Sequence, residues 1–144
     1  MIHFVVDASV AIKWYLPELH SAAAERLLSS EFRLLAPDLI IPEIGIILWK
    51  RIMKAELTVS AAQDIMTALE TVPLTLSPTG MLAESALAIA AGLKRSFYDS
   101  LYLALAVIAD CSLVTADRKL FDAVKNTTMM KKNMLWVEDV PPGM

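Results

Sequence analysis

The 144-residue sequence contains a single cysteine, Cys111, so no disulfide can form within the chain. This suits a reducing compartment, and we expect the protein to act in the cytoplasm. No basic leader precedes an apolar run at the N-terminus, so we expect no signal peptide. Pro42 and Glu43 interrupt one apolar run, and Asp99 and Asp110 bracket another. Neither run supplies the roughly 20 apolar residues that a membrane span needs, so we expect no membrane association.

The sequence also has few histidines and no excess of positive charge. His3 and His20 stand alone and form no His–Cys set with the spacing of a zinc site. The net charge is -3, with 13 Lys and Arg against 16 Asp and Glu. Proteins that bind nucleic acid through charge alone are basic. If this protein contacts nucleic acid, something must offset its own carboxylates, and a bound divalent metal would do so.

The chain is rich in apolar residues. Its hydrophobic content of 56% is enough for a buried core, and its charged content of 20% makes long disordered stretches unexpected. The length fits one compact domain, so we expect a single domain over residues 1–144.

Apolar runs rich in β-branched residues alternate with stretches of helical periodicity. The predicted strands cover residues 2–6, 33–36, 74–76, 112–115 and 135–137. The predicted helices cover residues 8–15, 19–29, 60–70, 79–92, 98–109 and 117–125, with a further helix beginning near residue 38. We expect N-capping by Asp38, a capping box over residues 60–63 and a C-terminal stop at Gly92. This alternation predicts an α/β fold with a central parallel sheet of about five strands and helices on both faces.

Four acidic residues stand where these elements meet. Asp7 ends the first predicted strand and Asp117 follows the fourth, and the carboxyl ends of parallel strands share one edge of a sheet. Glu43 lies in the first turns of an apolar helix, and Asp99 opens another. Clustered carboxylates repel one another and need a cation. An oxygen-only set of this kind suits Mg²⁺ or Mn²⁺.

A structural role remains the alternative for each acid taken alone. An Asp after a strand is a common helix N-cap, and a carboxylate near a helix N-terminus is stabilised by the helix dipole. The four acids together are less easily explained in this way, which favours a metal site.

Four stretches of the sequence resemble the PIN domain, and more narrowly the VapC-type toxins of type II toxin–antitoxin pairs. They occur in the order and spacing of that family over nearly the whole chain: Val-Val-Asp7-Ala-Ser9-Val, Pro42-Glu43, Tyr98-Asp99-Ser-Leu-Tyr-Leu-Ala-Leu-Ala, and Leu-Val-Thr115-Ala-Asp117-Arg-Lys-Leu. Ser100 departs from the family, in which alanine is usual at this position. The resemblance implies a three-layer α/β/α sandwich and an endoribonuclease that depends on Mg²⁺ or Mn²⁺.

The resemblance also implies the site residues. Asp7, Glu43, Asp99 and Asp117 would form the acidic quartet that holds metal, with Ser9 and Thr115 as supporting polar residues. Metal-activated water would cleave the RNA phosphodiester, so no catalytic histidine is needed. Basic residues near the C-terminus are candidates for phosphate contacts: Arg118, Lys119, Lys125, Lys131 and Lys132.

Three alternatives remain open. The first is a catalytically inactive PIN-like module that binds RNA or protein. The second is a phosphatase of another doubly wound class, but such enzymes place a second Asp two residues after the first, where this chain has Ser9. The third is a receiver domain, which needs adjacent acids near the N-terminus that residues 2–6 do not supply.

Two protein partners are also expected. A homodimer is predicted because several large apolar residues exceed what so small a core hides, namely Trp14, Tyr15, Trp49, Met53 and Met66. The resemblance implies a cognate antitoxin. We expect it to dock an apolar segment near residues 14–28 and to direct a basic side chain toward the acids.

Overall fold

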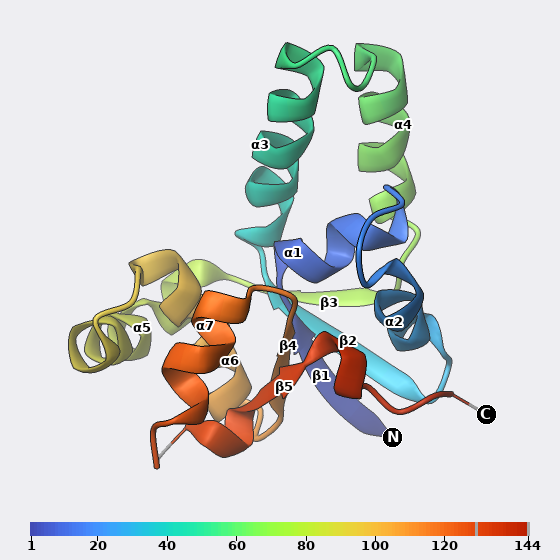
Figure 1. Cartoon of the computed structure of the whole chain (residues 1–144). Coiled ribbons are helices and arrows are strands. Elements are labelled where there is room, and N and C mark those ends of the chain that lie inside the picture. The colour runs from blue at the N-terminus through green and yellow to red at the C-terminus, as the bar shows by residue number, and fades with distance from the viewer. Residues whose placement is uncertain (129, 144) are drawn as a thin grey trace.

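The computed structural model, described for residues 1–128 and 130–143, alternates strands and helices along the chain (Figure 1). The strands are β1 (Ile2–Val6), β2 (Phe32–Pro37), β3 (Leu74–Ser77), β4 (Ser112–Thr115) and β5 (Met134–Trp136). The α-helices are α1 (Ala8–Ala11), α2 (Ser21–Glu25), α3 (Ile40–Met53), α4 (Val59–Leu69), α5 (Thr79–Leu93), α6 (Phe97–Ile108) and α7 (Arg118–Lys125). The short 3₁₀ helices are η1 (Ile12–Trp14), η2 (Arg26–Leu28), η3 (Lys131–Asn133) and η4 (Val137–Asp139). The predicted α/β class is confirmed.

The five strands form one parallel sheet in the order β3-β2-β1-β4-β5, which confirms the predicted five-stranded parallel sheet. The first strand therefore lies at the centre of the sheet. Its register pairs Val6 with Val114, so the residues that follow β1 and β4 leave the sheet at neighbouring positions on the same edge.

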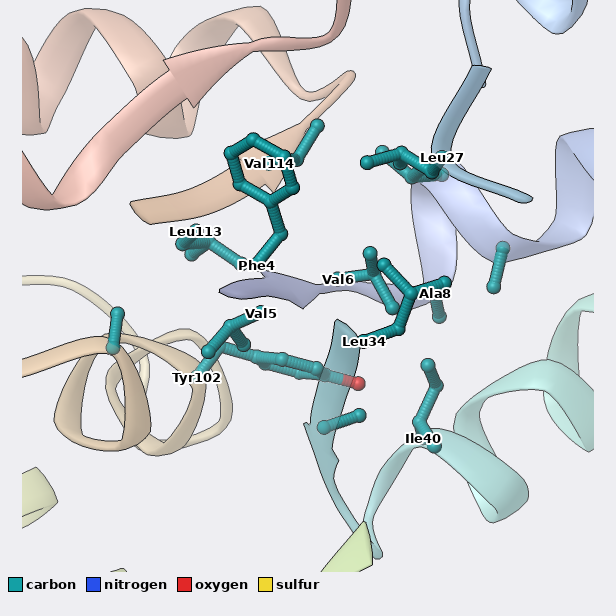
Figure 2. Close-up of a cluster of buried hydrophobic side chains, with 14 of the residues drawn as sticks. Phe4, Val5, Val6, Ala8, Leu27, Leu34, Ile40, Tyr102, Leu113 and Val114 are labelled. Carbon is teal, nitrogen blue, oxygen red and sulfur yellow. The ribbon is translucent and has the colours of Figure 1, made fainter. Parts of the chain in front are cut away.

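Helices cover both faces of this sheet. Figure 2 shows Val5 and Tyr102 on one side of β1, and Phe4 and Val6 facing Leu27 on the other. All five side chains are buried. Because successive residues of a strand point to opposite faces, the continuous apolar run of β1 fits a strand covered on both sides. The PIN-like α/β/α layering is thereby confirmed.

One helix pair extends away from the sheet. Helices α3 and α4 pack side by side and rise above the other elements in Figure 1. The long helix α3 begins beside the sheet, so its first turns are close to the strand ends while its last turns are not. Glu43 lies in the first turn.

Several predicted helix ends are wrong. Asp38 does not cap α3. Its carboxylate accepts a hydrogen bond from the Thr79 backbone N at 3.1 Å, at the start of α5. Thr58, rather than the predicted capping box, caps α4 by accepting from the Ala61 backbone N. Helix α5 runs past Gly92 to Leu93, and the C-cap Lys94, with a φ of 56°, gives the left-handed turn that the glycine was expected to supply.

The apolar residues behind the homodimer prediction divide into two groups. Trp14, Tyr15 and Met66 are partly buried and pack against the core. Trp49 and Met53 on α3 stay 56% and 62% exposed. No helix in the described ranges is long and apolar enough to cross a membrane.

Candidate functional site

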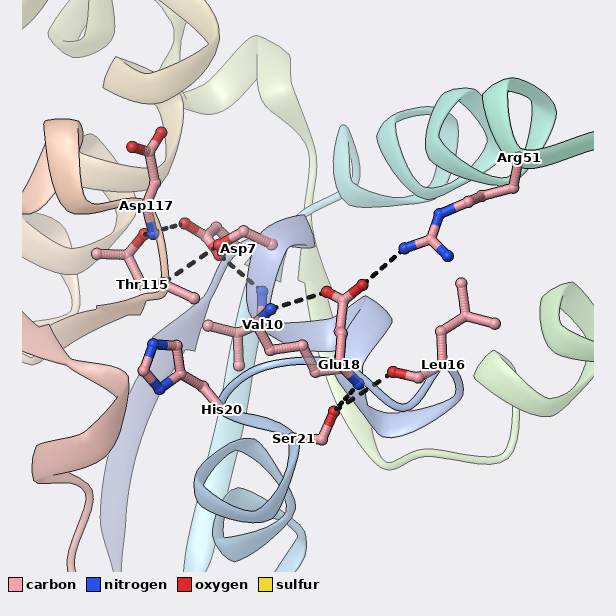
Figure 3. A network of polar contacts seen from close by, with 12 residues as sticks. Asp7, Val10, Leu16, Glu18, His20, Ser21, Arg51, Thr115 and Asp117 are labelled. Atoms are coloured by element: carbon pink, nitrogen blue, oxygen red, sulfur yellow. Dashed lines mark hydrogen bonds and ion pairs between the residues drawn. The ribbon is translucent and has the colours of Figure 1, made fainter. Parts of the chain in front are cut away.

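Asp7 is a nearly buried carboxylate at the end of the central strand, and three donors surround it (Figure 3). Its Oδ1 accepts hydrogen bonds from Ser9 Oγ at 2.6 Å and from the Val10 backbone N at 3.1 Å. Its Oδ2 accepts from Thr115 Oγ1 at 2.6 Å. The bond to Val10 makes Asp7 the N-cap of α1, so the structural interpretation of this residue is correct as far as it goes.

The two supporting hydroxyls join β4 to the same network. Thr115 Oγ1 accepts from the Asp117 backbone N at 3.0 Å while it donates to Asp7. Ser9 Oγ accepts from the Ala116 backbone N at 3.2 Å while it donates to Asp7. Each hydroxyl thus uses both its donor and an acceptor position. The β1–β4 pairing brings these residues together although Asp7 and Thr115 are 108 positions apart.

Burial raises the pKa of Asp7 from 3.8 to about 6. The hydrogen bonds from Ser9, Thr115 and Val10 lower this pKa because they stabilise the ionised carboxylate, and the nearby charge of Asp117 raises it. Asp117 itself caps α7, where its Oδ1 accepts from two backbone N–H groups of that helix.

Glu43 reaches the site from α3 and is held by Tyr102 of α6. The Tyr102 hydroxyl donates to Glu43 Oε1 at 2.5 Å. Burial raises the pKa of Glu43, the Tyr102 hydrogen bond lowers it, and the charge of Asp99 raises it. The pKa of Tyr102 is also raised, first by burial, then by Glu43, and further by the charges of Asp7 and Asp99. Tyr102 therefore lies within electrostatic reach of three of the four acids.

Asp99 has a positively charged partner within the chain. Its Oδ2 is 3.2 Å from Arg95 Nη2, four residues earlier. Its backbone N donates to Ser96 Oγ, the N-cap of α6. The carboxylate thus stands in the first turn of α6, as the sequence predicts, and its charge acts on Glu43 and Tyr102.

We call Asp7, Glu43, Asp99 and Asp117 the acidic cluster. The charges of Asp7 and Asp117 interact directly, as do those of Glu43 and Asp99. The two pairs are linked through Tyr102. Within residues 1–128 and 130–143, however, no three acidic, histidine or cysteine side chains converge closely enough to hold an ion. Each acid of the cluster has a hydrogen-bond or ion-pair partner from the chain instead.

Two residues of this site were not predicted as site residues, namely Tyr102 and Arg95. Tyr102 lies three residues after Asp99 on the same face of α6, and Arg95 lies four residues before Asp99, just ahead of the helix. The sequence offered this spacing as a signal. It did not show that Tyr102 would meet Glu43, because that contact joins helices 59 residues apart.

Cationic and aromatic side chains lie beside Asp117. The Arg118 guanidinium stands 4.0 Å from the centre of the Trp136 ring and 5.5 Å from that of Phe121. Trp136 lies next to Thr115 in the β4–β5 register. Of the proposed phosphate contacts, Arg118 and Lys125 both pair with Asp122, at 3.8 and 3.0 Å.

The comparisons with known proteins identify the family. The model of the PIN domain matches residues 4–126, which contain all four members of the acidic cluster. The chain belongs to the PIN domain family. No curated protein matches it.

Two solved structures share the fold of this PIN domain. One is PAE2754 from Pyrobaculum aerophilum, with 24% identity over 95% of this chain and 85% of that one, at a TM-score of 0.69. The other is a toxin–antitoxin complex from Klebsiella pneumoniae, with 14% identity over 94% of this chain and 98% of that one, at a TM-score of 0.57. At these identities the likeness establishes a shared architecture.

PIN domains are generally nucleases that use divalent metal. The donors available at this site fit such an ion in their chemistry, because the acidic cluster and its Ser9, Thr115 and Tyr102 partners offer only oxygen. No histidine or cysteine takes part in these contacts, which disfavours zinc.

Proposed function

We propose that this PIN domain is a Mg²⁺- or Mn²⁺-dependent endoribonuclease and the toxin of a type II toxin–antitoxin pair of the VapC type. The observation that carries the proposal is the buried Asp7 carboxylate. It is fixed by three hydrogen bonds at the carboxyl edge of the sheet, and its charge acts on Tyr102 while that of Asp117 acts on it. A structural N-cap alone needs neither burial nor further acids around it.

Asp7, Glu43, Asp99 and Asp117 are the residues that would hold the metal. A bound divalent cation supplies Lewis-acid polarisation of the phosphodiester and a more acidic water. Ser9 and Thr115 orient the Asp7 carboxylate, because both of its oxygens are held by their hydroxyls. Tyr102 fixes Glu43 through Oε1, so the other carboxylate oxygen is the one offered to a ligand or a proton.

RNA would be held by positive side chains around this edge. Arg118 is the best positioned of the candidate phosphate contacts because it follows Asp117 directly and its guanidinium stacks on Trp136. Stacking restricts the side chain, so less conformational freedom is lost when it binds a phosphate. Lys119, Lys125, Lys131 and Lys132 would add electrostatic attraction that weakens with salt.

The toxin assignment draws support from the PIN family match and from the fold shared with the Klebsiella complex. The cognate antitoxin would dock near residues 14–28, where Leu19 and Leu28 are exposed. It would direct a basic side chain toward the acidic cluster. Action in the cytoplasm, expected from the lone Cys111, belongs to this proposal.

A homodimer also belongs to the proposal. Ile46, Trp49 and Met53 are exposed at helical spacing on α3 and form an apolar stripe. Association of two chains through this stripe would remove its surface from water.

The test is cleavage of a mixed RNA pool by purified protein with Mg²⁺, with Mn²⁺ and with a chelator. We expect cleavage that requires metal and is lost in Asp7→Asn and Asp99→Asn. Asp64→Asn, which removes an exposed carboxylate of α4, is the matched control and should cleave as the wild type does. Metal-independent RNA binding without any cleavage would instead support the inactive PIN-like module.

A further inference from the structure

An arginine of this chain already occupies part of the acidic cluster. Arg95 Nη2 lies 3.2 Å from Asp99 Oδ2, the distance of a charge-assisted hydrogen bond. The remaining acids of the cluster are held by neutral donors: hydroxyls and backbone amides for Asp7, backbone amides for Asp117, and a phenol for Glu43.

The backbone around Arg95 aims this side chain at the first turn of α6. Helix α5 ends at Leu93, and its C-cap Lys94 adopts a left-handed conformation with a φ of 56°. Ser96 then caps α6 by accepting from the Asp99 backbone N at 3.0 Å. Arg95 lies between these two fixed points, so its side chain extends along the start of α6 to reach Asp99.

The Arg95–Asp99 pair is also partly shielded from water. The two side chains keep 26% and 29% of their exposure, whereas Arg118 and Asp122, at the same spacing of four residues, keep 56% and 47%. Arg95 Nε is buried and has no hydrogen-bond partner in the part of the chain that the structure describes. A shielded ion pair is screened less by salt than an exposed one.

We propose that Arg95 is the internal counter-cation of the acidic cluster, and that a divalent cation must displace it from Asp99 in order to bind. This inference rests on the proposed function, since it assigns a regulatory part to a residue beside the proposed metal ligands. Asp99 Oδ2 cannot fully coordinate a metal ion while it accepts a hydrogen bond from the guanidinium. Two cations close to one carboxylate also repel each other. Arg95 therefore sets how much metal is needed to fill the site.

The test measures Mn²⁺ binding to metal-free protein without RNA, by electron paramagnetic resonance of the free ion. Arg95→Gln removes the competing charge and keeps a polar side chain. We expect it to bind Mn²⁺ about threefold to thirtyfold more tightly than the wild type, the range expected when one partly screened charge is removed a few ångströms away. Arg95→Lys keeps the charge without the planar guanidinium and should fall between the two.

Two control variants test whether the loss of any positive charge, rather than the loss of Arg95 in particular, tightens Mn²⁺ binding. Arg51→Gln removes the same charge from another partly buried ion pair, with Glu18 at 2.7 Å, which Figure 3 shows on the side of α3. Lys94→Gln removes the exposed charge adjacent to Arg95 in the chain. Both variants should bind Mn²⁺ within about twofold of the wild type, because Arg51 pairs with acids outside the cluster and the charge of exposed Lys94 is screened by solvent and salt.

Metal-free melting gives a second readout. Arg95→Gln should melt below the wild type without metal, since Asp99 then faces Glu43 uncompensated, and should recover more on adding Mn²⁺. Near-UV circular dichroism establishes that each variant is folded. If Arg95→Gln is not folded, the comparison of the wild type with Arg95→Lys decides the question.

The outcomes distinguish this inference from the proposed function. If Arg95→Gln binds Mn²⁺ as tightly as the wild type or less tightly, the displacement of Arg95 by metal is overturned. The same follows if Lys94→Gln gains as much Mn²⁺ affinity as Arg95→Gln. If the wild type cleaves RNA with metal in either case, the proposed function stands alone. A wild type that neither binds Mn²⁺ nor cleaves RNA overturns both.

Discussion

The Tyr102 hydroxyl donates to Glu43 Oε1 at 2.5 Å and so joins helix α6 to helix α3 at the edge of the acidic cluster. Tyr102 is buried, and its pKa is raised by burial and by the neighbouring carboxylates, so it remains a neutral donor. The contact holds an acid of the projecting α3–α4 pair against α6, where the charge of Asp99 acts on it.

Replacing Tyr102 with Phe removes this donor and keeps the ring. The pKa of Glu43 should rise further, because the hydrogen bond lowers it while burial and Asp99 raise it. Carbon-13 NMR of the Glu43 carboxyl measures this shift directly. RNA cleavage by the variant should need a higher pH, and the unfolding free energy should fall by about 1–3 kcal/mol for a bond to a charged group. An unchanged Glu43 pKa would mean that the contact is not formed in solution.

Asp7 makes the metal-free protein more stable in mild acid. Its folded pKa of about 6 exceeds the unfolded value of 3.8, so the folded state holds the proton more tightly between these values. This contribution is fully present below the unfolded pKa and is lost as the pH rises through the folded pKa. Lowering the pH from 7 to 5 should therefore stabilise the wild type by about 1 kcal/mol through this group.

Asp7→Asn removes that titration and is the variant that isolates it. Chemical denaturation at several pH values should show a smaller gain on acidification for the variant than for the wild type. At pH 7 the variant avoids the cost of a buried charge, of about 3 kcal/mol from the pKa shift. It also loses one of the three hydrogen bonds, because an amide nitrogen cannot accept from a donor. Identical pH dependence in the two proteins would place the Asp7 pKa near its usual range.

Arg118→Ala should weaken RNA binding more than it slows the chemical step. The guanidinium stacked on Trp136 is beside Asp117 but contacts no member of the cluster through its side chain in the described structure. We expect the KM for RNA to rise by about threefold to tenfold, little change in kcat, and a smaller dependence of binding on salt. Lys54→Ala, at the far end of α3, is the control. A fall in kcat with unchanged KM would contradict a role in binding.

The apolar stripe on α3 should be needed for dimerisation. Trp49→Ser combined with Met53→Ser removes its two most exposed members, which contribute little to the monomer core. Light scattering at micromolar concentration should show a dimer for the wild type and a 15.8 kDa monomer for the double variant. Met81→Ser, which alters an even more exposed apolar residue of α5, should remain a dimer. A monomeric wild type would exclude the homodimer.

The sheet and the strand-end positions of Asp7 and Asp117 were predictable because local patterns determine them. A continuous apolar run that stops at a turn-forming residue indicates a buried parallel strand, and parallel strands end at a common edge. Helix ends were less predictable. Asp38 has the chemistry of an N-cap, but the turn into α5 offers it the Thr79 amide instead. Such tertiary competition leaves no trace in the local sequence.

The partners of the acids were the least predictable part of the site. The resemblance implied Thr115 as a supporting residue, and its contact with Asp7 follows from the β1–β4 pairing in the structure. The contact of Tyr102 with Glu43 depends on how two helices approach each other. Arg95 lies at a spacing that predicts an ion pair on a helix, yet it precedes the cap of α6, where helical spacing does not strictly apply.

The link between Asp7 and Thr115 also bears on when the site forms during synthesis. The ribosome makes Asp7 108 residues before it makes Thr115, and Asp117 follows two residues later. Strand β4 must emerge and pair with β1 before the carboxylate is enclosed. A nascent or truncated chain that stops before β4 therefore lacks the Thr115 and Asp117 side of the site, so the proposed nuclease can become active only after β4 has been translated.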